Sequence, residues 1–279
     1  MKECLLELKD ASFSYDGEKN ALDRINVKIH KGERIAVLGS NGSGKSTFFL
    51  CLNGIHGLTL GDIILNGKKV GHKKKDQSLL CKEVGFVFQD PDNQMIGSTV
   101  ESEISFGLMN RNVPGDEIKK RMDRITEELN LTQFRNRPPY YLSGGEKKRV
   151  TIADILVLRP NILLLDEPTA SLDLKNIEAF EKILENDEIS GMAVLISIHD
   201  VDFAWRWAKR ILVFHEGKIL SDDTPEHTFA DDDLLKLTGL KKPVYYTITE
   251  ALCRKEGIKL PEYIPKNDSQ FYEFLENWG

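Results

Sequence analysis

The sequence predicts an α/β protein that consists of one large domain and a small C-terminal extension. Short apolar segments with strand character alternate with segments of helical periodicity, which is typical of an open sheet covered by helices. At 279 residues the chain is long enough to bury roughly three quarters of its unfolded surface, so a large core is available. After residue 222, acidic residues and prolines divide short helical patches. We therefore expect a main domain over residues 1–222 and an extension over residues 223–279.

The N-terminal part is predicted to be rich in β-structure, with Gly and Asp/Asn turn positions between the strands. The strand candidates of this part are Leu5–Leu8, Ser12–Tyr15, Ile25–Ile29, Ile35–Leu38 and Ile63–Leu65. Later strand candidates are Val84–Phe88, Ile162–Leu165, Ala193–Ile198 and a hairpin of Ile211–Phe214 with Lys218–Leu220.

Helices are predicted between these strands and in the extension. A middle block starts at Pro114-Gly115 and carries apolar residues at helical spacing as far as Leu129. The other helix candidates are Thr47–Asn53, Leu174–Glu185, Thr249–Lys255 and Phe271–Trp278.

A phosphate-binding loop is predicted between a strand and a helix, where residues 39–46 read G-x-x-x-x-G-K-S. Its glycines let successive backbone N–H groups turn toward phosphates, and the helix N-terminus adds a positive dipole. We expect Lys45 to reach the β- and γ-phosphates of a nucleotide and Ser46 to offer its hydroxyl to Mg²⁺. The candidate nucleotide-binding residues of this loop are Gly39, Ser40, Asn41, Gly42, Ser43, Gly44, Lys45, Ser46 and Thr47.

Three further strand candidates end in polar residues suited to phosphate chemistry, namely Gln89, Asp166-Glu167 and His199. Ligands of open α/β sheets bind beyond the carboxyl ends of the strands, so four such strand ends in one chain predict one site. As single features these residues have ordinary alternatives: a turn after a strand, a loop glutamine and a surface histidine. Together with the phosphate loop they favour a catalytic arrangement.

The chemistry of each side chain suggests its role. The Asp166 carboxylate is suited to hold the shell of Mg²⁺, and Glu167 to act as a general base on the attacking water. Gln89 has a carbonyl for the metal and an amide that orients this water. His199 is expected to hydrogen-bond the γ-phosphate and stabilise the charge that develops there.

Composition excludes several classes of protein. The net charge of −6 is unlike that of proteins whose main partner is nucleic acid. Four scattered cysteines without C-x-x-C spacing indicate neither structural disulfides nor a zinc site. The N-terminus lacks the apolar region of a signal peptide, and no apolar stretch is long enough to span a bilayer. If the protein works at a membrane, we expect another chain to cross it.

A second motif, Leu142-Ser143-Gly144-Gly145-Glu146, precedes a helix and is spaced as a capping box. With Gln89 before it and Asp166 after it, the motif resembles the L-S-G-G-Q signature of the ATP-binding subunits of ATP-binding cassette (ABC) proteins. Glu146 departs from the usual glutamine, which puts the role of that side chain in doubt.

The resemblance covers residues 4–222 and implies an ABC ATPase cassette. Such a cassette has a RecA-like parallel-sheet core, an N-terminal antiparallel β subdomain and an α-helical subdomain at about residues 90–145. It also implies that Tyr15 stacks on adenine, with a half-buried strand aromatic as the alternative, that Ser171-Leu172-Asp173 is the D-loop and that His199 is the switch histidine. Two subunits would pair head to tail, with Ser143, Gly144 and Gly145 of one closing over the ATP of the other.

A narrower resemblance lies in Gln89-Asp90-Pro91-Asp92-Asn93-Gln94 and the following Thr99–Gly107 stretch. Both are similar to energy-coupling factor importers, particularly the cobalt/nickel type. This implies an ATPase, with ATP and Mg²⁺, that is peripheral on the cytoplasmic face of the membrane. The implied partners are a second ATPase subunit (the same chain or a paralogue), a transmembrane coupling subunit that docks at Pro91–Phe106, and an integral substrate-binding subunit for cobalt, nickel or a vitamin.

Other readings stay open at this point. The ATPase of another ABC transporter would share the same catalytic core. A soluble DNA-repair or chromosome ATPase is less favoured because no sustained heptads occur, and a translation factor because the chain has one phosphate loop.

Overall fold

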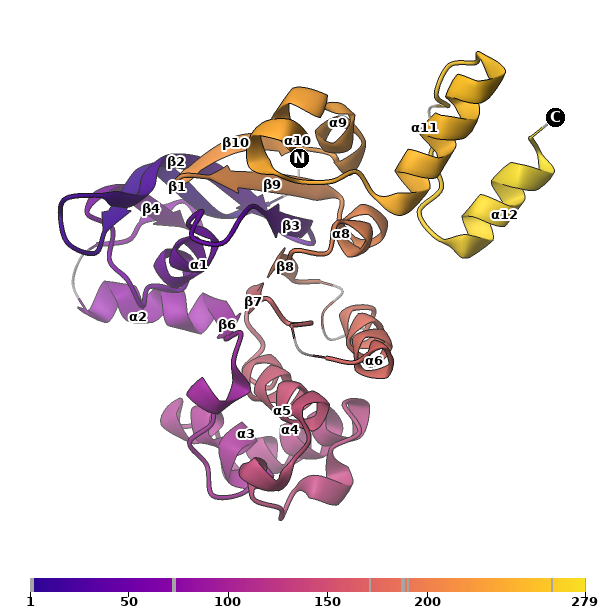
Figure 1. Ribbon diagram of the computed structural model, residues 1–279. Helices are drawn as coiled ribbons and strands as arrows, with labels where there is room; N and C mark the ends of the chain where they lie inside the picture. Colours follow the sequence, from indigo (N-terminus) through magenta and orange to yellow (C-terminus); the bar gives the residue numbers. More distant parts are fainter. Residues whose placement is uncertain are drawn as a thin grey trace. The chain divides into compact units, whose positions relative to one another are not determined.

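The computed structural model describes residues 3–71, 74–170, 172–186, 189, 191–261 and 263–278 (Figure 1). Contacts between residues divide the chain into two compact units. Unit 1 comprises Met1–Glu33 and Ser46–Ser197, and unit 2 comprises Arg34–Lys45 and Ile198–Gly279. The boundary at residue 222 that the sequence suggests stays a prediction.

Unit 1 contains an antiparallel sheet in the strand order β2-β1-β4-β5. Its strands are β1 (Cys4–Ser14), β2 (Asn20–His30), β4 (Leu60–Leu65) and β5 (Lys68–Lys69). The prediction of two strands within β1 was wrong, because the chain continues through a register shift between Leu8 and Ala11. Asp10 has a φ of 45° there, so an irregularity that looks like a turn in sequence is a bulge within one strand.

Unit 1 also contains three parallel strands, β6 (Val84–Val87), β7 (Ile162–Asp166) and β8 (Ala193–Ser197). Strand β7 pairs with both neighbours, and its Leu165 lies opposite Val87 on one side and Ile196 on the other. Every residue of the three strands is buried, as expected for parallel strands covered on both faces. Three of the four polar positions that the sequence predicts at strand ends, Gln89, Asp166-Glu167 and His199, therefore lie at the end of one of these strands or follow it closely in sequence.

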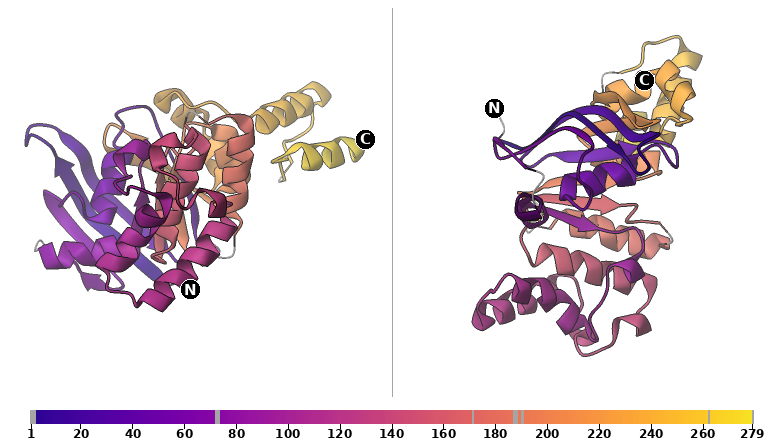
Figure 2. Two further views of the ribbon diagram at one scale, coloured as in Figure 1. Left: turned by 90° about the horizontal axis from the view of Figure 1, so that it is seen from below. Right: turned by 90° about the vertical axis from the view of Figure 1, so that its left-hand side faces the viewer.

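Helices α3, α4 and α5 form a cluster in unit 1, which Figures 1 and 2 show in magenta and rose. The predicted start at Pro114-Gly115 is confirmed, since α4 begins at Gly115 after Pro114. The helical elements that lie wholly or largely in unit 1 are α1 (Lys45–Asn53), α2 (Lys74–Glu83), α3 (Val100–Asn110), α4 (Gly115–Glu128), α5 (Gly144–Leu156), α6 (Leu174–Leu184) and the 3-10 turns Pro91–Asn93, Thr132–Phe134 and Pro139–Tyr141.

Unit 2 pairs β3 (Arg34–Leu38) in parallel with β9 (Arg210–His215), which pairs antiparallel with β10 (Lys218–Asp223). The predicted hairpin at Glu216-Gly217 is thus confirmed. The helices of unit 2 are α8 (Val201–Trp207), α9 (Pro225–Ala230), α10 (Asp232–Thr238), α11 (Val244–Glu256) and α12 (Asp268–Glu276).

The last two helices of unit 2 lie side by side as a hairpin (Figures 1 and 2). The rings of Tyr245 and Phe271 join them, with centroids 5.4 Å apart. The segment is tied to α8 by Trp205, whose indole N–H donates to the Pro265 carbonyl at 2.8 Å. Across the described residues, no helix combines the length and the apolar composition that crossing a membrane requires.

Candidate functional site

The phosphate loop of unit 2 follows β3, as the sequence predicts. Gly39, Gly42 and Gly44 have φ values of 146°, 75° and 109°, which are strained for residues with a Cβ. A Cβ on Gly39 would also overlap the carbonyl oxygen of Phe214 on β9. The loop therefore needs glycine at this position for close backbone approach as well as for its dihedral angles.

Lys45 lies across this loop and holds it closed. Its ammonium donates to the carbonyls of Gly39 at 2.8 Å and Ser40 at 3.2 Å, and the residue is 5% exposed. The Ser43 hydroxyl is buried and has no hydrogen-bond partner in the part of the chain that the structure describes. A buried hydroxyl without a partner carries a free-energy penalty that an added acceptor such as a phosphate oxygen removes. The loop thus has the donors that a nucleotide's phosphates require.

The first residues of unit 1 after the loop are Ser46, which is exposed, and Thr47, which is buried. The Thr47 hydroxyl lies 3.1 Å from the hydroxyl of Tyr15, which follows the end of β1. The Tyr15 ring makes edge contacts with Phe13 and His56 at centroid distances of 4.8 and 5.4 Å, yet the residue is 63% exposed. A supported aromatic ring that remains open to solvent is suited to stack on a flat ligand. His56 was not expected from the sequence, because nothing in its spacing links it to Tyr15.

Gln89 and Glu167 meet in unit 1. The Gln89 side-chain amide donates to the Glu167 carboxylate at 3.0 Å, which joins the ends of β6 and β7. Since the amide nitrogen is used in this way, the amide oxygen of Gln89 is the atom that is suited to a cation.

Asp166 and Glu167 are both anchored to Ser197 at the end of β8. The Ser197 hydroxyl donates to the Asp166 carboxylate, and the Glu167 backbone N–H donates to the same hydroxyl at 3.0 Å. Glu167 has a φ of 41°, in the left-handed region that side-chain-bearing residues rarely adopt. Such strained residues concentrate at functional sites, where surrounding contacts maintain the conformation. Sequence reasoning missed Ser197, since a serine inside a predicted strand carries no motif.

The signature segment begins α5 with the predicted capping box. The Ser143 hydroxyl accepts from the Glu146 N–H at 3.4 Å, and the Glu146 carboxylate accepts from the Ser143 N–H at 2.7 Å. The structure thereby gives Glu146 a role that the sequence left in doubt, that of a cap. Gly144 faces open space, whereas a Cβ on Gly145 would overlap the side-chain amide of Asn176 on α6.

The remaining predicted residues are distributed as follows. His199 belongs to unit 2 with the phosphate loop, and it is exposed just before α8. In the predicted D-loop, Ser171 lies outside the described residues, and Asp173 caps α6 by accepting from the Asn176 N–H at 2.9 Å.

The predicted metal ligands Ser46, Gln89 and Asp166 all belong to unit 1 and offer only oxygen atoms. This donor set suits Mg²⁺, which takes one or two carboxylates and completes its shell with substrate phosphates and water. Over the described residues, no group of three or more His, Cys, Asp or Glu side chains is arranged to hold a metal by protein ligands alone. The oxygen donors of Ser46, Gln89 and Asp166 are thus of the kind that Mg²⁺ takes.

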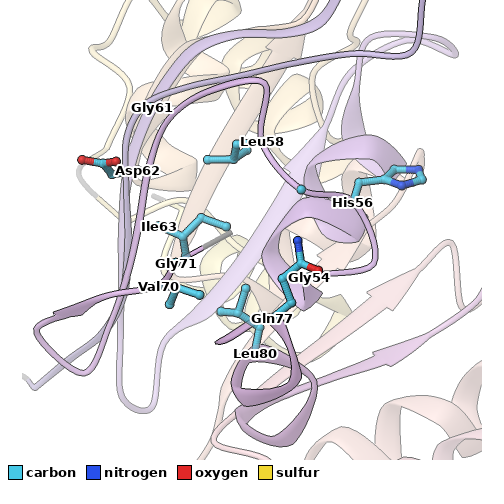
Figure 3. A pocket seen from close by; sticks show the side chains of 11 residues that line it. Gly54, His56, Leu58, Gly61, Asp62, Ile63, Val70, Gly71, Gln77 and Leu80 are labelled. Carbon is cyan, nitrogen blue, oxygen red and sulfur yellow. The ribbon is translucent and has the colours of Figure 1, made fainter. Parts of the chain in front are cut away.

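A separate pocket of unit 1 does not fit a nucleotide. It is lined by His56, Leu58, Ile63, Gln77 and Leu80 together with several glycines (Figure 3). Its free volume is about 20 Å³, which is room for a single water molecule.

The chain is similar to known proteins in sequence. A family model described as "ABC transporter" matches residues 22–170. The energy-coupling factor transporter ATP-binding protein EcfA of Methanocaldococcus jannaschii is 39% identical over 256 residues, which are 92% of this chain and 92% of the relative.

Two solved structures share the fold. The structure of cbiO1 from Clostridium perfringens, described as part of the ABC transporter complex cbiONQ, has a TM-score of 0.76 at 32% identity and covers 92% of this chain and 100% of that chain. The dimeric post-hydrolysis state of the ATP-binding cassette MJ0796, bound to ADP and Pi, has a TM-score of 0.71 at 28% identity and covers 79% of this chain and 99% of that chain. The predicted cassette fold, with antiparallel and parallel β-structure, is confirmed.

Proposed function

We propose that this chain, which belongs to the ABC transporter family and within it to the energy-coupling factor transporter ATP-binding proteins, drives the import of a micronutrient such as a cobalt or nickel ion or a vitamin. As a member of this family it is an ATPase whose hydrolysis is coupled to transport. The observation that supports a hydrolytic role most directly is the 3.0 Å hydrogen bond between Gln89 and Glu167. It holds the carboxylate of the general base in one orientation.

In this proposal the phosphate loop binds the phosphates of ATP. The backbone N–H groups of residues 39–45 and the N-terminus of α1 donate to the phosphate oxygens, while Lys45 exchanges its two carbonyl acceptors for the β- and γ-phosphates. Thr47 continues the loop, and the exposed ring of Tyr15 stacks on adenine. The hydroxyl of Tyr15 keeps its contact with the hydroxyl of Thr47.

We assign the magnesium shell to the hydroxyl of Ser46, the amide oxygen of Gln89 and the carboxylate of Asp166. When bound, Mg²⁺ supplies charge neutralisation for the β- and γ-phosphate oxygens. The Ser197 hydroxyl donates to the Asp166 carboxylate and would hold it in place for this role.

The hydrolytic step is assigned to Glu167. Its carboxylate accepts a proton from a water molecule whose oxygen attacks the γ-phosphorus, while the bond from the γ-phosphorus to the β,γ-bridging oxygen breaks and ADP leaves with that electron pair. The Gln89 amide keeps the carboxylate in the orientation for the proton transfer. His199 donates to a γ-phosphate oxygen and stabilises the charge that develops there.

The second half of each ATP site is assigned to a partner ATPase subunit, either a second copy or a paralogue. Residues Ser143, Gly144 and Gly145 lie at the N-terminus of a helix of 13 residues, where the positive end of the helix dipole favours an anion. We propose that they close over the γ-phosphate bound by the partner. The dimeric state of the relative MJ0796 supports this arrangement.

We further propose that the subunit is peripheral to the membrane on its cytoplasmic face. There it binds a transmembrane coupling subunit and, through it, an integral subunit that captures the substrate. The relative cbiO1 is described as part of the ABC transporter complex cbiONQ, which supports the assignment. The docking surface is assigned to Pro91–Phe106, where Ile96 and Phe106 are exposed by 71% and 44%.

The experiment that tests this function is affinity purification from detergent-solubilised native cells, with mass spectrometry of the bound proteins. A polytopic membrane protein together with a small integral subunit is the expected result. Recovery with a membrane protein of a different transporter type would replace the importer assignment by the alternative ABC transporter reading. Recovery from the soluble fraction with DNA would overturn both.

A further inference from the structure

A buried lysine on the signature helix contacts the segment that carries Gln89. Lys148 lies on α5, one turn after the signature, and is only 3% exposed. Its ammonium donates to the carbonyl oxygens of Phe88 at 3.0 Å and of Gln89 at 2.8 Å. Both acceptors are backbone atoms at the point where β6 ends.

Burying this ammonium carries a free-energy penalty that an apolar side chain of the same length would avoid. Burial lowers the pKa of Lys148 to about 8, although the carboxylates of Asp166 and Asp90 act in the opposite direction. Two carbonyl acceptors and two nearby carboxylates offset part of the lost hydration. The side chain is therefore held in one place and has little freedom to leave its acceptors.

The same segment is tied to α5 from its other side by Gln94. The Gln94 side chain accepts from the Phe88 N–H at 3.2 Å, and it donates to the Thr151 carbonyl at 3.0 Å and the Asp154 carboxylate at 3.2 Å. Both backbone polar groups of Phe88 are thus bonded to groups that α5 holds. An ion pair of 2.6 Å between Lys147 and Asp92 adds a third connection.

We propose that Lys148 is a positioning residue for ATP hydrolysis, which fixes the backbone of Gln89 so that its side-chain amide stays on Glu167. This inference rests on the hydrolytic role proposed above for Glu167. Lys148 itself touches neither substrate nor the reacting atoms. It acts through the chain of contacts from α5 to the Gln89 carbonyl and from the Gln89 amide to Glu167.

These hydrogen bonds couple the position of α5 to the position of Gln89. Helix α5 begins at the signature residues, so a displacement of this helix moves Lys148 and, through its two hydrogen bonds, the backbone of Gln89. A misplacement of about 1 Å in a catalytic arrangement costs up to about 10²-fold in rate. The reactivity of Glu167 is thereby made to depend on the position of the signature helix in the same subunit.

The test compares the steady-state ATPase kinetics of Lys148→Met and Lys148→Gln with those of wild type and of Lys119→Met, whose lysine is exposed on α4. Methionine fills the space without a donor, whereas glutamine keeps a neutral donor. We expect kcat to fall about 10- to 100-fold in Lys148→Met, with KM for ATP within about twofold, and to fall less in Lys148→Gln. Lys119→Met removes an exposed positive charge from α4 and leaves the hydrogen bonds of Lys148 in place, so its basal kcat should stay within about twofold of wild type.

A double-mutant cycle with Gln89→Ala separates positioning from a general structural effect. If Lys148 acts through the Gln89 side chain, Lys148→Met should lower kcat no further in the Gln89→Ala background. Circular dichroism checks the folding of each variant. If Lys148→Met does not fold, the same cycle with Lys148→Gln decides.

Three outcomes would overturn the proposal: an unchanged kcat in Lys148→Met, an equal fall with and without the Gln89 side chain, or equal losses in the glutamine and methionine variants. Equal losses in the two variants would mean that the fall in kcat comes from the lost positive charge of Lys148, because only the glutamine variant keeps a hydrogen-bond donor. Absence of ATP hydrolysis in the wild-type protein would instead contradict the proposed function itself.

Discussion

The side-chain amide of Gln89 donates a 3.0 Å hydrogen bond to the Glu167 carboxylate across 78 residues of sequence. The bond joins the ends of two adjacent parallel strands, β6 and β7. Glu167 is also fixed through its backbone, whose N–H donates to the Ser197 hydroxyl at 3.0 Å. The carboxylate is therefore oriented from two directions, and its position depends on residues of three strands or their ends.

Replacing Glu167 with glutamine tests its role as the general base. The Gln side chain has the same shape and its carbonyl can still accept from the Gln89 amide, but it cannot take a proton from water. We expect Glu167→Gln to lower turnover by about 10²–10⁴-fold and to keep ATP bound. Phosphate release and equilibrium binding of a fluorescent ATP analogue measure the two effects, with Glu178→Gln on the exposed face of α6 as the control. Turnover near the wild-type rate would remove Glu167 from the mechanism.

Tyr15 offers a ring and a hydroxyl that can be tested separately. If the ring stacks on adenine, Tyr15→Ala should weaken ATP binding by about 1–3 kcal/mol. Tyr15→Phe should retain most of the affinity, because it loses only the contact with the Thr47 hydroxyl. Isothermal titration calorimetry with ATP measures both variants. Unchanged affinity in the alanine variant would make Tyr15 a packing residue, and equal losses in both would assign the effect to the hydroxyl.

The strands of this fold could be predicted from the sequence more completely than its helices. Strands such as β7 and β8 are short apolar runs followed by a polar residue, a local pattern. Helix α3 (Val100–Asn110) was not predicted, because its buried face includes Glu103 and its capping box uses Ser102 in place of Glu or Gln. Helices α2 and α8 were also missed, since one is largely polar and the other has only 7 residues.

The positions of the candidate site residues could be predicted from the sequence where these residues form motifs. The phosphate loop, the capping box of Ser143 and the strand-end residue Asp166 have local spacing that predicts where they lie in the fold. Ser197, Asn176 and Lys148 could not be found in this way, because each acts through a contact with a residue that is distant in sequence. Only the fold brings such pairs together, and the residues themselves are ordinary types in ordinary elements.

The two signature glycines are predicted to differ in their tolerance of a methyl group. A Cβ on Gly145 would overlap the Asn176 amide, which is restrained by its 2.8 Å hydrogen bond to Asp173. Gly145→Ala should therefore lower the free energy of unfolding by about 1–3 kcal/mol, as overpacked sites do. Gly144→Ala, which meets open space, should change it by less than about 1 kcal/mol.

Thermal unfolding of the two variants measures this difference. Because the clash is with one side chain, the double variant Gly145→Ala with Asn176→Ala should regain most of the lost stability. Equal stability of the two single variants would show that the neighbourhood of Gly145 adapts without loss.

The free energy of unfolding is predicted to depend on pH through the carboxyl group of Asp154. Burial raises the pKa of this carboxyl from 3.8 to about 7, with a further contribution from Glu103, against the hydrogen bond from Gln94. Between about pH 4 and pH 7 the folded protein therefore holds a proton that the unfolded chain has released. A state that binds more protons is favoured at low pH, so this group makes the free energy of unfolding fall as pH rises through that window and then level off.

Asp154→Asn removes this titration and leaves an oxygen that can accept from Gln94. At about 1.4 kcal/mol per pH unit over about three pH units, the asparagine variant should gain up to about 4 kcal/mol relative to wild type between pH 4 and pH 7. Urea denaturation followed by circular dichroism at several pH values measures the difference. The exposed Asp116 at the start of α4 supplies the control, since Asp116→Asn should give a stability profile parallel to that of wild type. Parallel profiles for Asp154→Asn as well would mean that the Asp154 carboxyl is ionised throughout this range in the folded protein.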